Sequence, residues 1–136
     1  MSQQILVRDA MSYNSVSLRA NISVEEAAAK LLAHNLPGAP VINERQEVIG
    51  FASEHDLLCK VLSSSYHASS GANVEDVMRK DVLSVNPNDS IIELAQTMAN
   101  TNKPKVFPVI EGNKLVGTIT RGLLLKSLVT NLAAAR

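Results

Sequence analysis

Apolar runs alternate with polar turns along the chain, and their periods predict an ordered set of helices and strands. Ser23 and Ser53 each precede a segment whose apolar positions have helical spacing, so each is expected to cap a helix. Two apolar runs separated by the polar turn 43–47 predict a β-hairpin. The elements expected in the first half are a strand at 15–18, a helix at 24–32, strands at 39–42 and 48–52, and a helix at 54–62. Their order is β-α-β-β-α.

The second half of the chain repeats this order. Its elements are expected at Val82–Val85, Ser90–Asn100, Val106–Ile110, Leu115–Thr120 and Arg121–Ala135. Between the halves, residues 64–73 are rich in serine and other small residues, which is typical of a linker. We therefore expect an α/β (α+β) protein in which residues 1–63 and 74–136 are two copies of one motif.

A fixed offset supports this internal duplication. The near-identical pentads Val7–Met11 and Val74–Met78 are 67 residues apart. The same offset relates two later pairs, Gly50 with Gly117 and Ser53 with Thr120. The offset is 68 residues where Pro40–Ile42 matches Pro108–Ile110, and it returns to 67 in the hairpin turn that follows. A length change confined to a turn is expected of a structural unit used twice. Because 136 residues provide the core of about one domain, we expect the two halves to share a core.

Composition narrows the possible functions. The chain has 13 basic and 13 acidic residues, no net charge and no basic run, so nucleic acid and anionic membranes are not expected partners. No apolar stretch has the length of a membrane span, and the first residues lack the features of a signal peptide. The single Cys59 cannot form an internal disulfide, which fits a reducing compartment. We therefore expect a cytoplasmic protein.

The repeated pattern resembles the tandem cystathionine-β-synthase (CBS) domain pair, or Bateman module. The resemblance covers about Val7 to Leu128 and rests on the pentads, the Gly-Ala-Pro-Val and Phe-Pro-Val strand starts and the Gly-x-x-Ser/Thr strand ends. It implies two β-α-β-β-α repeats packed around a pseudo-twofold axis, with two clefts that in many members bind AMP, ATP or S-adenosylmethionine. It also implies a regulatory role without catalysis.

The family's ligand motif is complete in the first copy, from Gly50 to Asp56. The resemblance implies that Asp56 binds the ribose and that Ser53 lies at the phosphate. A carboxylate has acceptor oxygens for both ribose hydroxyls, and a helix N-terminus attracts phosphate. A plainer interpretation stays open, because Ser53-x-x-Asp56 is also a capping box, a pattern that recurs at Ser23-x-x-Glu26 and Ser90-x-x-Glu93.

The second copy departs from the motif, because Leu123 occupies the position of the acid. A leucine cannot accept a hydrogen bond from a ribose, so the second cleft is expected to be empty or to bind weakly. The resemblance implies that Lys105, Thr120 and Arg121 contact the phosphate of a ligand in the first cleft. The alternative is that the two basic side chains are simply solvated.

For the base, the resemblance implies a slot between the first strand and the Pro-Val strand. Its expected residues are Ser15, Val16, Ser17, Ala39, Pro40 and Val41. Such a slot would recognise an adenine-like plane through backbone groups and apolar side chains. The alternative is that Val16 and Val41 are ordinary core residues.

Other residues give no sign of catalytic or metal chemistry. His34, His55 and His67 are scattered, and no Cys or His pair has metal-ligand spacing, so no metal site is expected. Cys59 lies among leucine and valine residues and is expected to be a buried thiol. No resident cofactor is expected, and no residue set supports an enzyme.

Two interpretations follow. The first is a regulatory module that binds one adenosyl nucleotide per chain and signals its occupancy to a separate protein in trans. The second is a ligand-free interaction module. The helices at 57–62 and 123–129 are more apolar than one buried stripe requires, so we also expect a homodimer.

Overall fold

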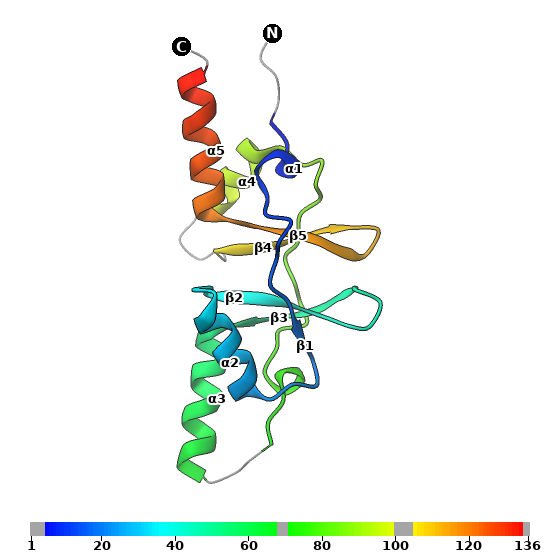
Figure 1. The fold of residues 1–136 in the computed structure, drawn as a ribbon, viewed down its shortest axis with the longest axis vertical. Coiled ribbons are helices and arrows are strands. Elements are labelled where there is room, and N and C mark those ends of the chain that lie inside the picture. The colour runs from blue at the N-terminus through cyan, green and yellow to red at the C-terminus, as the bar shows by residue number, and fades with distance from the viewer. Residues whose placement is uncertain (1–4, 68–70, 100–104, 135–136) are drawn as a thin grey trace. The chain divides into compact units, whose positions relative to one another are not determined.

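The computed structural model describes residues 5–67, 71–99 and 105–134 and divides the chain into two compact units (Figure 1). One comprises Val16–Val82 with Asn113–Leu115, and we call it the Asp56 unit. The other comprises Met1–Ser15, Leu83–Gly112 and Val116–Arg136, and we call it the Leu123 unit. Each unit has a hydrophobic core of its own.

The compact units do not coincide with the sequence repeats, because each repeat gives its leading pentad to the core of the other unit. Val7 and Met11 pack in the core of the Leu123 unit, together with Ile91 and Ile119. Val74, from the second pentad, is fully buried in the core of the Asp56 unit. Two cores therefore replace the single shared core expected from the sequence, and each requires residues from both halves.

The Asp56 unit contains a three-stranded sheet in the order β1-β2-β3. β1 (Leu18–Arg19) is parallel to β2 (Gly38–Ile42), which is antiparallel to β3 (Val48–Ser53). Asn43 stabilises the turn between β2 and β3, because its Oδ1 accepts hydrogen bonds from the N–H groups of Arg45 and Glu47 at 2.9 and 3.0 Å. The predicted hairpin is confirmed.

Helices α2 (Val24–Ala33) and α3 (Glu54–His67) lie side by side in the same unit (Figure 1). α2 begins at the predicted position, because Ser23 Oγ accepts a hydrogen bond from the Glu26 N–H at 3.0 Å. Its Val24, Ala27 and Leu31 are buried, as the helical spacing of apolar residues predicts. The short 3₁₀ helix η1 (Val74–Asp76) belongs to this unit as well.

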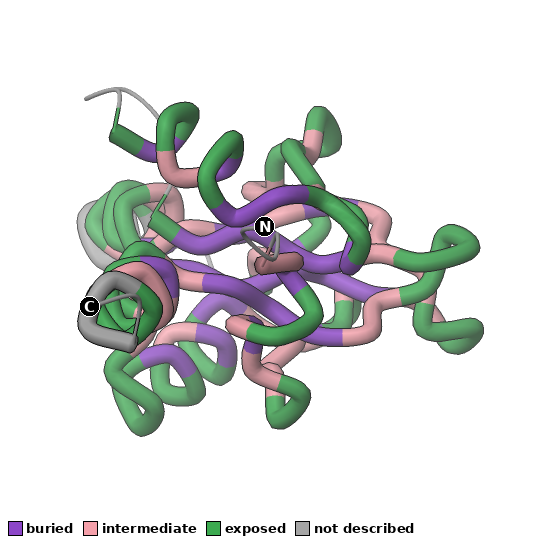
Figure 2. The backbone as a smooth tube through the Cα atoms, turned by 90° about the horizontal axis from the view of Figure 1, so that it is seen from above, coloured by how far each residue is buried: buried purple, intermediate pink, exposed green. Residues whose placement is uncertain are grey.

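The Leu123 unit has the corresponding elements of the second repeat together with the first pentad. They are α1 (Val7–Ala10), α4 (Ile91–Met98), β4 (Val106–Glu111), β5 (Lys114–Thr120) from Val116 onward, and α5 (Arg121–Ala134). β4 and β5 form a two-stranded sheet. Ser90 caps α4 through a hydrogen bond from the Ile92 N–H to its Oγ at 3.2 Å. β2 and β4 are largely buried, β3 and β5 are partly buried, and the turns are exposed (Figure 2).

The prediction of a strand at Val82–Val85 is wrong. Only Val85 pairs with β4, through backbone hydrogen bonds of 3.1 and 2.8 Å to Pro108 and Ile110. The chain then turns at Asn86-Pro87, and the proline has no N–H to offer a neighbouring strand. Pairing therefore ends after a single residue.

Other element limits shift without changing the order. The first strand is β1 at Leu18–Arg19 instead of 15–18, and α3 continues to His67, so the predicted linker 64–73 is helical at its start. Residues 68–70, Asn100 and Ala135 lie outside the described residues. The repeat limits 1–63 and 74–136 stay a prediction.

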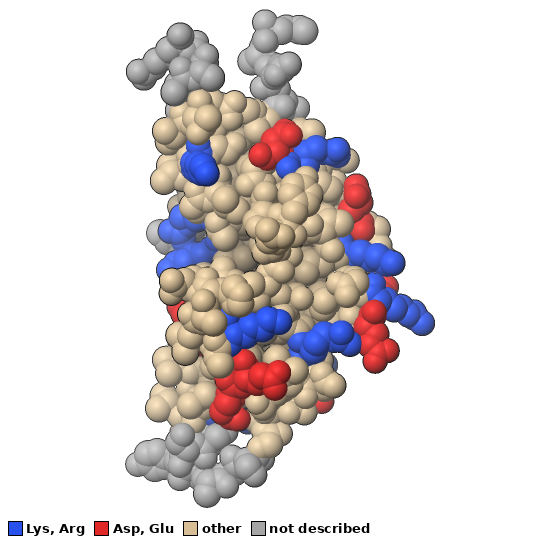
Figure 3. All heavy atoms as spheres, in the orientation of Figure 1, with Lys and Arg blue, Asp and Glu red and all other residues tan. Residues whose placement is uncertain are grey.

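Charged side chains of both signs are mixed over the face shown in Figure 3. That mixture agrees with the absence of net charge in the sequence. Within the described residues, every helix is too short or too polar to cross a membrane.

Candidate functional site

The Gly-x-x-Ser motif of the first repeat spans the end of β3 and the start of α3. Gly50 has no room for a side chain, since a Cβ atom there would lie 2.5 Å from Met78 Sδ and 3.0 Å from Arg79 O. This close approach accompanies two backbone hydrogen bonds of 2.9 Å between Phe51 and Arg79. The glycine therefore allows the segment after the second pentad to lie against the end of β3.

Ser53 and Asp56 interact in the first turn of α3. The Asp56 N–H donates to Ser53 Oγ at 3.1 Å, and the Ser53 hydroxyl donates to Asp56 Oδ2 at 2.8 Å. Ser53 thus caps the helix at the end where the peptide dipoles favour negative charge. The Asp56 side chain stays 19% exposed, so a ligand can reach it.

Arg79 forms an ion pair with Asp56 from a distant part of the sequence. Its Nε donates to Asp56 Oδ2 at 3.3 Å, and its side chain is 67% exposed. In the described part of the chain, Oδ1 of Asp56 accepts no hydrogen bond. One carboxylate oxygen is therefore held by Ser53 and Arg79, while the other can accept hydrogen bonds from a ligand.

Asp56 does not complete a capping box. In such a box the acid accepts a hydrogen bond from the backbone N–H of the cap residue. Asp76 does so from Asn73 at 2.8 Å. The Asp56 carboxylate instead contacts the Ser53 hydroxyl and the Arg79 guanidinium. Capping explains the serine of the motif but not its acid.

The first segment of the predicted base slot is divided between the units. Ser15 belongs to the Leu123 unit, whereas Val16 and Ser17 belong to the Asp56 unit, and all three are half-buried. Lys30 of α2 donates through Nζ to the Ser17 carbonyl at 2.8 Å. This bond fixes the chain just before β1.

The second segment of the predicted slot lies in β2. Ala39, Pro40 and Val41 are all buried, and Val41 pairs with Leu18 of β1. The side chains of Ala39 and Val41 belong to the core of the Asp56 unit, which agrees with the plainer interpretation. A contact between this strand and a base stays a prediction.

The predicted phosphate contacts lie around the start of α5 in the Leu123 unit. Thr120 Oγ1 accepts a hydrogen bond from the Leu123 N–H at 3.1 Å and caps α5. The Arg121 N–H donates to the Lys105 carbonyl at 3.1 Å, which brings the two basic residues together. Both of these residues are exposed. Their contact with phosphate stays a prediction.

The Leu123 unit repeats the backbone arrangement of the site. A Cβ atom at Gly117 would collide with the Ser12 carbonyl oxygen. Ser12 and Thr118 exchange backbone hydrogen bonds of 2.8 and 3.0 Å. The charged pair is absent at these positions, because Leu123 stands at the offset position of Asp56 and Ser12 at that of Arg79.

Arg79 was not among the residues predicted from the sequence. A signal was available, since Arg79 is offset by the repeat distance from Ser12 and directly follows the second pentad. Its partner is 23 residues away in sequence, so no local pattern connects the two. Only the backbone bonds between Phe51 and Arg79 explain their proximity.

Cys59 is exposed, so the prediction of a buried thiol is wrong. Leu57 and Val61 pack against the core of the Asp56 unit, and Cys59 lies on the opposite face of α3. Its Sγ is 3.7 Å from Nε2 of His55, one helical turn away. Among the residues that the structure describes, no cluster of three or more His, Cys, Asp and Glu could hold a metal ion.

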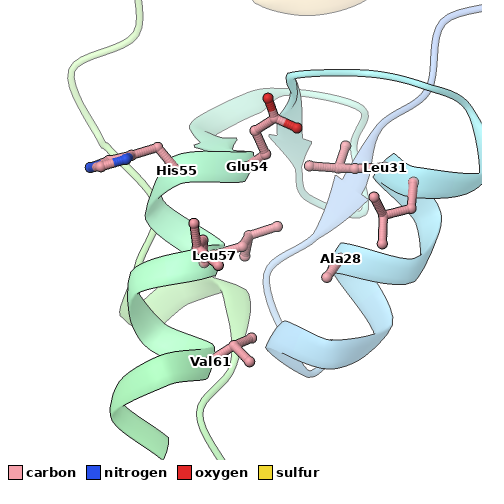
Figure 4. A pocket seen from close by; sticks show the side chains of 8 residues that line it. Ala28, Leu31, Glu54, His55, Leu57 and Val61 are labelled. Carbon is pink, nitrogen blue, oxygen red and sulfur yellow. The ribbon is translucent and has the colours of Figure 1, made fainter.

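An apolar groove of about 470 Å³ lies between α2 and α3. Figure 4 shows Ala28 and Leu31 of α2 facing Leu57 of α3 across it. Leu32 and Leu58 also line the groove and are 74% and 57% exposed. The groove therefore presents aliphatic surface to solvent, which is typical of a protein contact.

Comparison with known families gives a match over most of the chain. The family model described as "CBS domain" matches residues 7–63 and again residues 74–130. Among curated proteins, MJ1225 of Methanocaldococcus jannaschii is 29% identical over 122 residues, which are 90% of this chain and 42% of the relative. The chain thus spans less than half the length of that relative.

Solved structures show the same fold. AcuB of Vibrio cholerae is similar with a TM-score of 0.84 and 26% identity, covering 96% of this chain and 95% of that chain. CBSX2 of Arabidopsis thaliana, solved in complex with AMP, has a TM-score of 0.80 and 26% identity, covering 93% of this chain and 97% of that chain.

Proposed function

Because the chain belongs to the CBS domain family, with one motif in each half, we propose that it is a regulatory module whose ligand is an adenosyl nucleotide of the AMP, ADP, ATP or S-adenosylmethionine type. The Asp56 unit provides the ribose contact. Occupancy of the site is signalled to a separate protein in trans. The nucleotide is a regulatory ligand and not a cofactor, and the module is not itself an enzyme.

The carboxylate of Asp56 is the observation that carries this proposal. Oδ2 is fixed by Ser53 at 2.8 Å and by Arg79 at 3.3 Å, so the carboxylate is oriented before a ligand arrives. Oδ1 accepts no hydrogen bond from the described residues. A ribose diol can donate to it, at the helix end that favours a nearby phosphate.

The structural relative CBSX2, which was solved with AMP, supports an adenosyl ligand for this chain. The base would lie between the segment at Val16 and Ser17 and strand β2. Ser53, at the start of α3, would contact the phosphate. One tight site per chain is expected, because Leu123 offers no acceptor at the second position.

We place the protein in the cytoplasm. Its lone Cys59 is an exposed free thiol, which persists most readily in a reducing compartment.

A thermal-shift panel tests the proposed ligand class. The probes are AMP, ADP, ATP and S-adenosylmethionine, with GTP as the non-adenosyl control. A ligand that binds only the folded protein at 100 times its Kd stabilises it by about 2.7 kcal/mol, which raises the melting temperature measurably. At least one adenosyl probe is expected to raise the melting temperature more than GTP does. If all five leave it unchanged, the nucleotide-binding proposal is wrong.

A second function, protein interaction, is favoured by the exposed faces of the long helices. Leu58 and Leu62 on α3 are 57% and 61% exposed, and Leu125 and Val129, at the same offset on α5, are 62% and 56% exposed. Two equivalent apolar faces suit self-association, because a second copy offers matching surfaces. The protein is therefore proposed to form a homodimer through α3 and α5.

Light scattering at micromolar concentration tests the homodimer. The wild type should have twice the mass of the chain, and the double variant Leu58→Glu/Leu125→Glu should be monomeric with its helix content retained. A wild-type mass equal to one chain would refute the homodimer. A dimer that binds none of the nucleotides would favour the ligand-free interaction module.

A further inference from the structure

Resting on the function proposed above, we infer that Arg79 makes the Asp56 site selective for adenosyl ligands that carry phosphate. Its guanidinium compensates the negative charge of Asp56 and offers hydrogen-bond donors to an anionic group on the ligand. Arg79 is thereby a specificity-determining residue, and the ligand class narrows to adenosine phosphates in preference to adenosine or S-adenosylmethionine.

The position of Arg79 is fixed at its backbone and open at its tip. Its N–H and carbonyl each form a 2.9 Å hydrogen bond with Phe51, and these two bonds hold its backbone against β3. Its side chain is 67% exposed and contacts Asp56 through Nε alone. Between described residues, Nη1 and Nη2 form no hydrogen bond or ion pair. These two nitrogens can therefore bind a phosphate in the forked geometry that guanidinium favours.

The charge balance of the site gives the reason for the selectivity. Asp56 alone would attract a ribose through hydrogen bonds but repel the phosphates attached to the same ligand. The Arg79 guanidinium, 3.3 Å from the carboxylate, removes this repulsion. Adenosine carries no charge, and S-adenosylmethionine has a net positive charge because a sulfonium and an ammonium group accompany its one carboxylate. Both therefore gain less from a neighbouring guanidinium than a phosphate ligand does.

The second repeat supports the pairing of the two residues. The Leu123 unit retains the crowded glycine, the hydroxyl cap at Thr120 and the paired backbone at Ser12. It lacks both the acid and the cation. The unit that has the carboxylate also has the guanidinium, and the unit that lacks one lacks both. This is expected if Arg79 acts on Asp56 and on the ligand that Asp56 binds.

Titration calorimetry with four probes tests the inference: adenosine, AMP, ATP and S-adenosylmethionine. The variants are Arg79→Gln, which removes the charge, and Arg79→Lys, which keeps it. Arg45→Gln is the matched control, because Arg45 lies in the β2–β3 turn, at the other end of the hairpin from Ser53. Asp56→Ala is included to test the ribose contact separately.

Arg79→Gln should weaken AMP and ATP binding by about tenfold, the effect of one charge-assisted hydrogen bond, with ATP affected at least as much as AMP. Adenosine should change by less than about twofold, and S-adenosylmethionine should bind as well or better. Arg79→Lys should recover most of the loss, and Arg45→Gln should bind like the wild type.

Equal weakening of all four probes in Arg79→Gln would show a structural role and overturn the inference, as would unchanged ATP affinity. In either case the proposed function stands if Asp56→Ala still weakens nucleotide binding by at least about tenfold. If the wild type binds none of the probes, the proposed function and the inference are both wrong.

Discussion

In the Asp56 unit a crowded glycine, a capping hydroxyl and a paired backbone segment surround an ion pair, whereas in the Leu123 unit the same three features surround a leucine and a serine. Both units thus have the same backbone arrangement. They differ in the two charged side chains that this arrangement brings together in one unit, Asp56 and Arg79. We conclude that duplication preserved the backbone geometry, while the side chains proposed to bind a ribose and a phosphate occur in only one of the two units.

The comparison also separates two roles of one sequence motif. The glycine and the hydroxyl residue serve the fold in both units, since the glycine admits the neighbouring backbone and the hydroxyl caps the helix. The acid serves no such purpose, because its carboxylate does not accept the N–H of the cap residue. The acid is therefore the motif residue to test for function.

The largest expected effects concern the equivalence of the two cores. Leu57 and Leu124 occupy equivalent positions in the two repeats, and both are 2% exposed. Leu57→Ala and Leu124→Ala should each lower the free energy of unfolding by about 2–5 kcal/mol, because each leaves a cavity. Urea unfolding checks this. A cost below about 1 kcal/mol for only one of the two variants would show that the cores are not equivalent.

Next in size are the crowded glycines. Gly50→Ala and Gly117→Ala should each cost about 1–3 kcal/mol, because the added methyl group must displace the backbone of Arg79 or of Ser12. Gly122→Ala is the control, since its Cβ would meet only Thr120 Oγ1 at 3.9 Å and alanine favours the helix by about 0.5–1 kcal/mol. Thermal unfolding shows whether each of the three variants has a lower or a higher melting temperature than the wild type. A stabilising Gly50→Ala would contradict the close approach.

The charged pair can also be transferred. The double variant Ser12→Arg/Leu123→Asp should give the Leu123 unit a second adenosyl site, with an affinity gain of at least about tenfold, or 1.4 kcal/mol. Calorimetry with AMP should then show two binding events per chain. If a single event persists while the variant remains folded, the difference between the units is not confined to these two side chains.

The smallest effect is on stability at the site itself. Asp56→Ala removes one exposed ion pair and one hydrogen bond, and it should lower the free energy of unfolding by only about 0.5–1 kcal/mol. Asp89→Ala is the matched control, because Asp89 Oδ2 accepts a hydrogen bond from the Asn86 N–H at 2.9 Å in the Leu123 unit. Similar melting temperatures for the two variants are expected. A loss of several kcal/mol in Asp56→Ala alone would give the acid a structural role.

The sequence predicted the parts of the fold that depend on local periodicity. The helices behind Ser23 and Ser53 and the β2–β3 hairpin are confirmed, because caps, apolar spacing and turn residues are all local signals. The strand at Val82–Val85 was wrong, since its length depends on pairing with β4 and on the following Asn86-Pro87. The exchange of the two pentads between units was likewise not predicted, because it depends on which core each pentad enters.

The site was only partly predictable for the same reason. Ser53 and Asp56 share one helical turn, and their contact could be expected from spacing alone. Arg79 enters through a backbone pairing between distant segments, which no sequence window contains. Cys59 was misplaced because its neighbours suggested burial, whereas the helix rotates it to the exposed face.

The most direct test of the account is the affinity of AMP for three proteins by titration calorimetry: the wild type, Asp56→Ala and Asp89→Ala. The wild type and Asp89→Ala should each bind one AMP tightly per chain. Asp56→Ala should lose at least tenfold in affinity, about 1.4 kcal/mol, because its ribose acceptor is gone. If Asp56→Ala binds AMP as tightly as the wild type, Asp56 is not the ribose contact and the difference between the two units has no role in ligand binding.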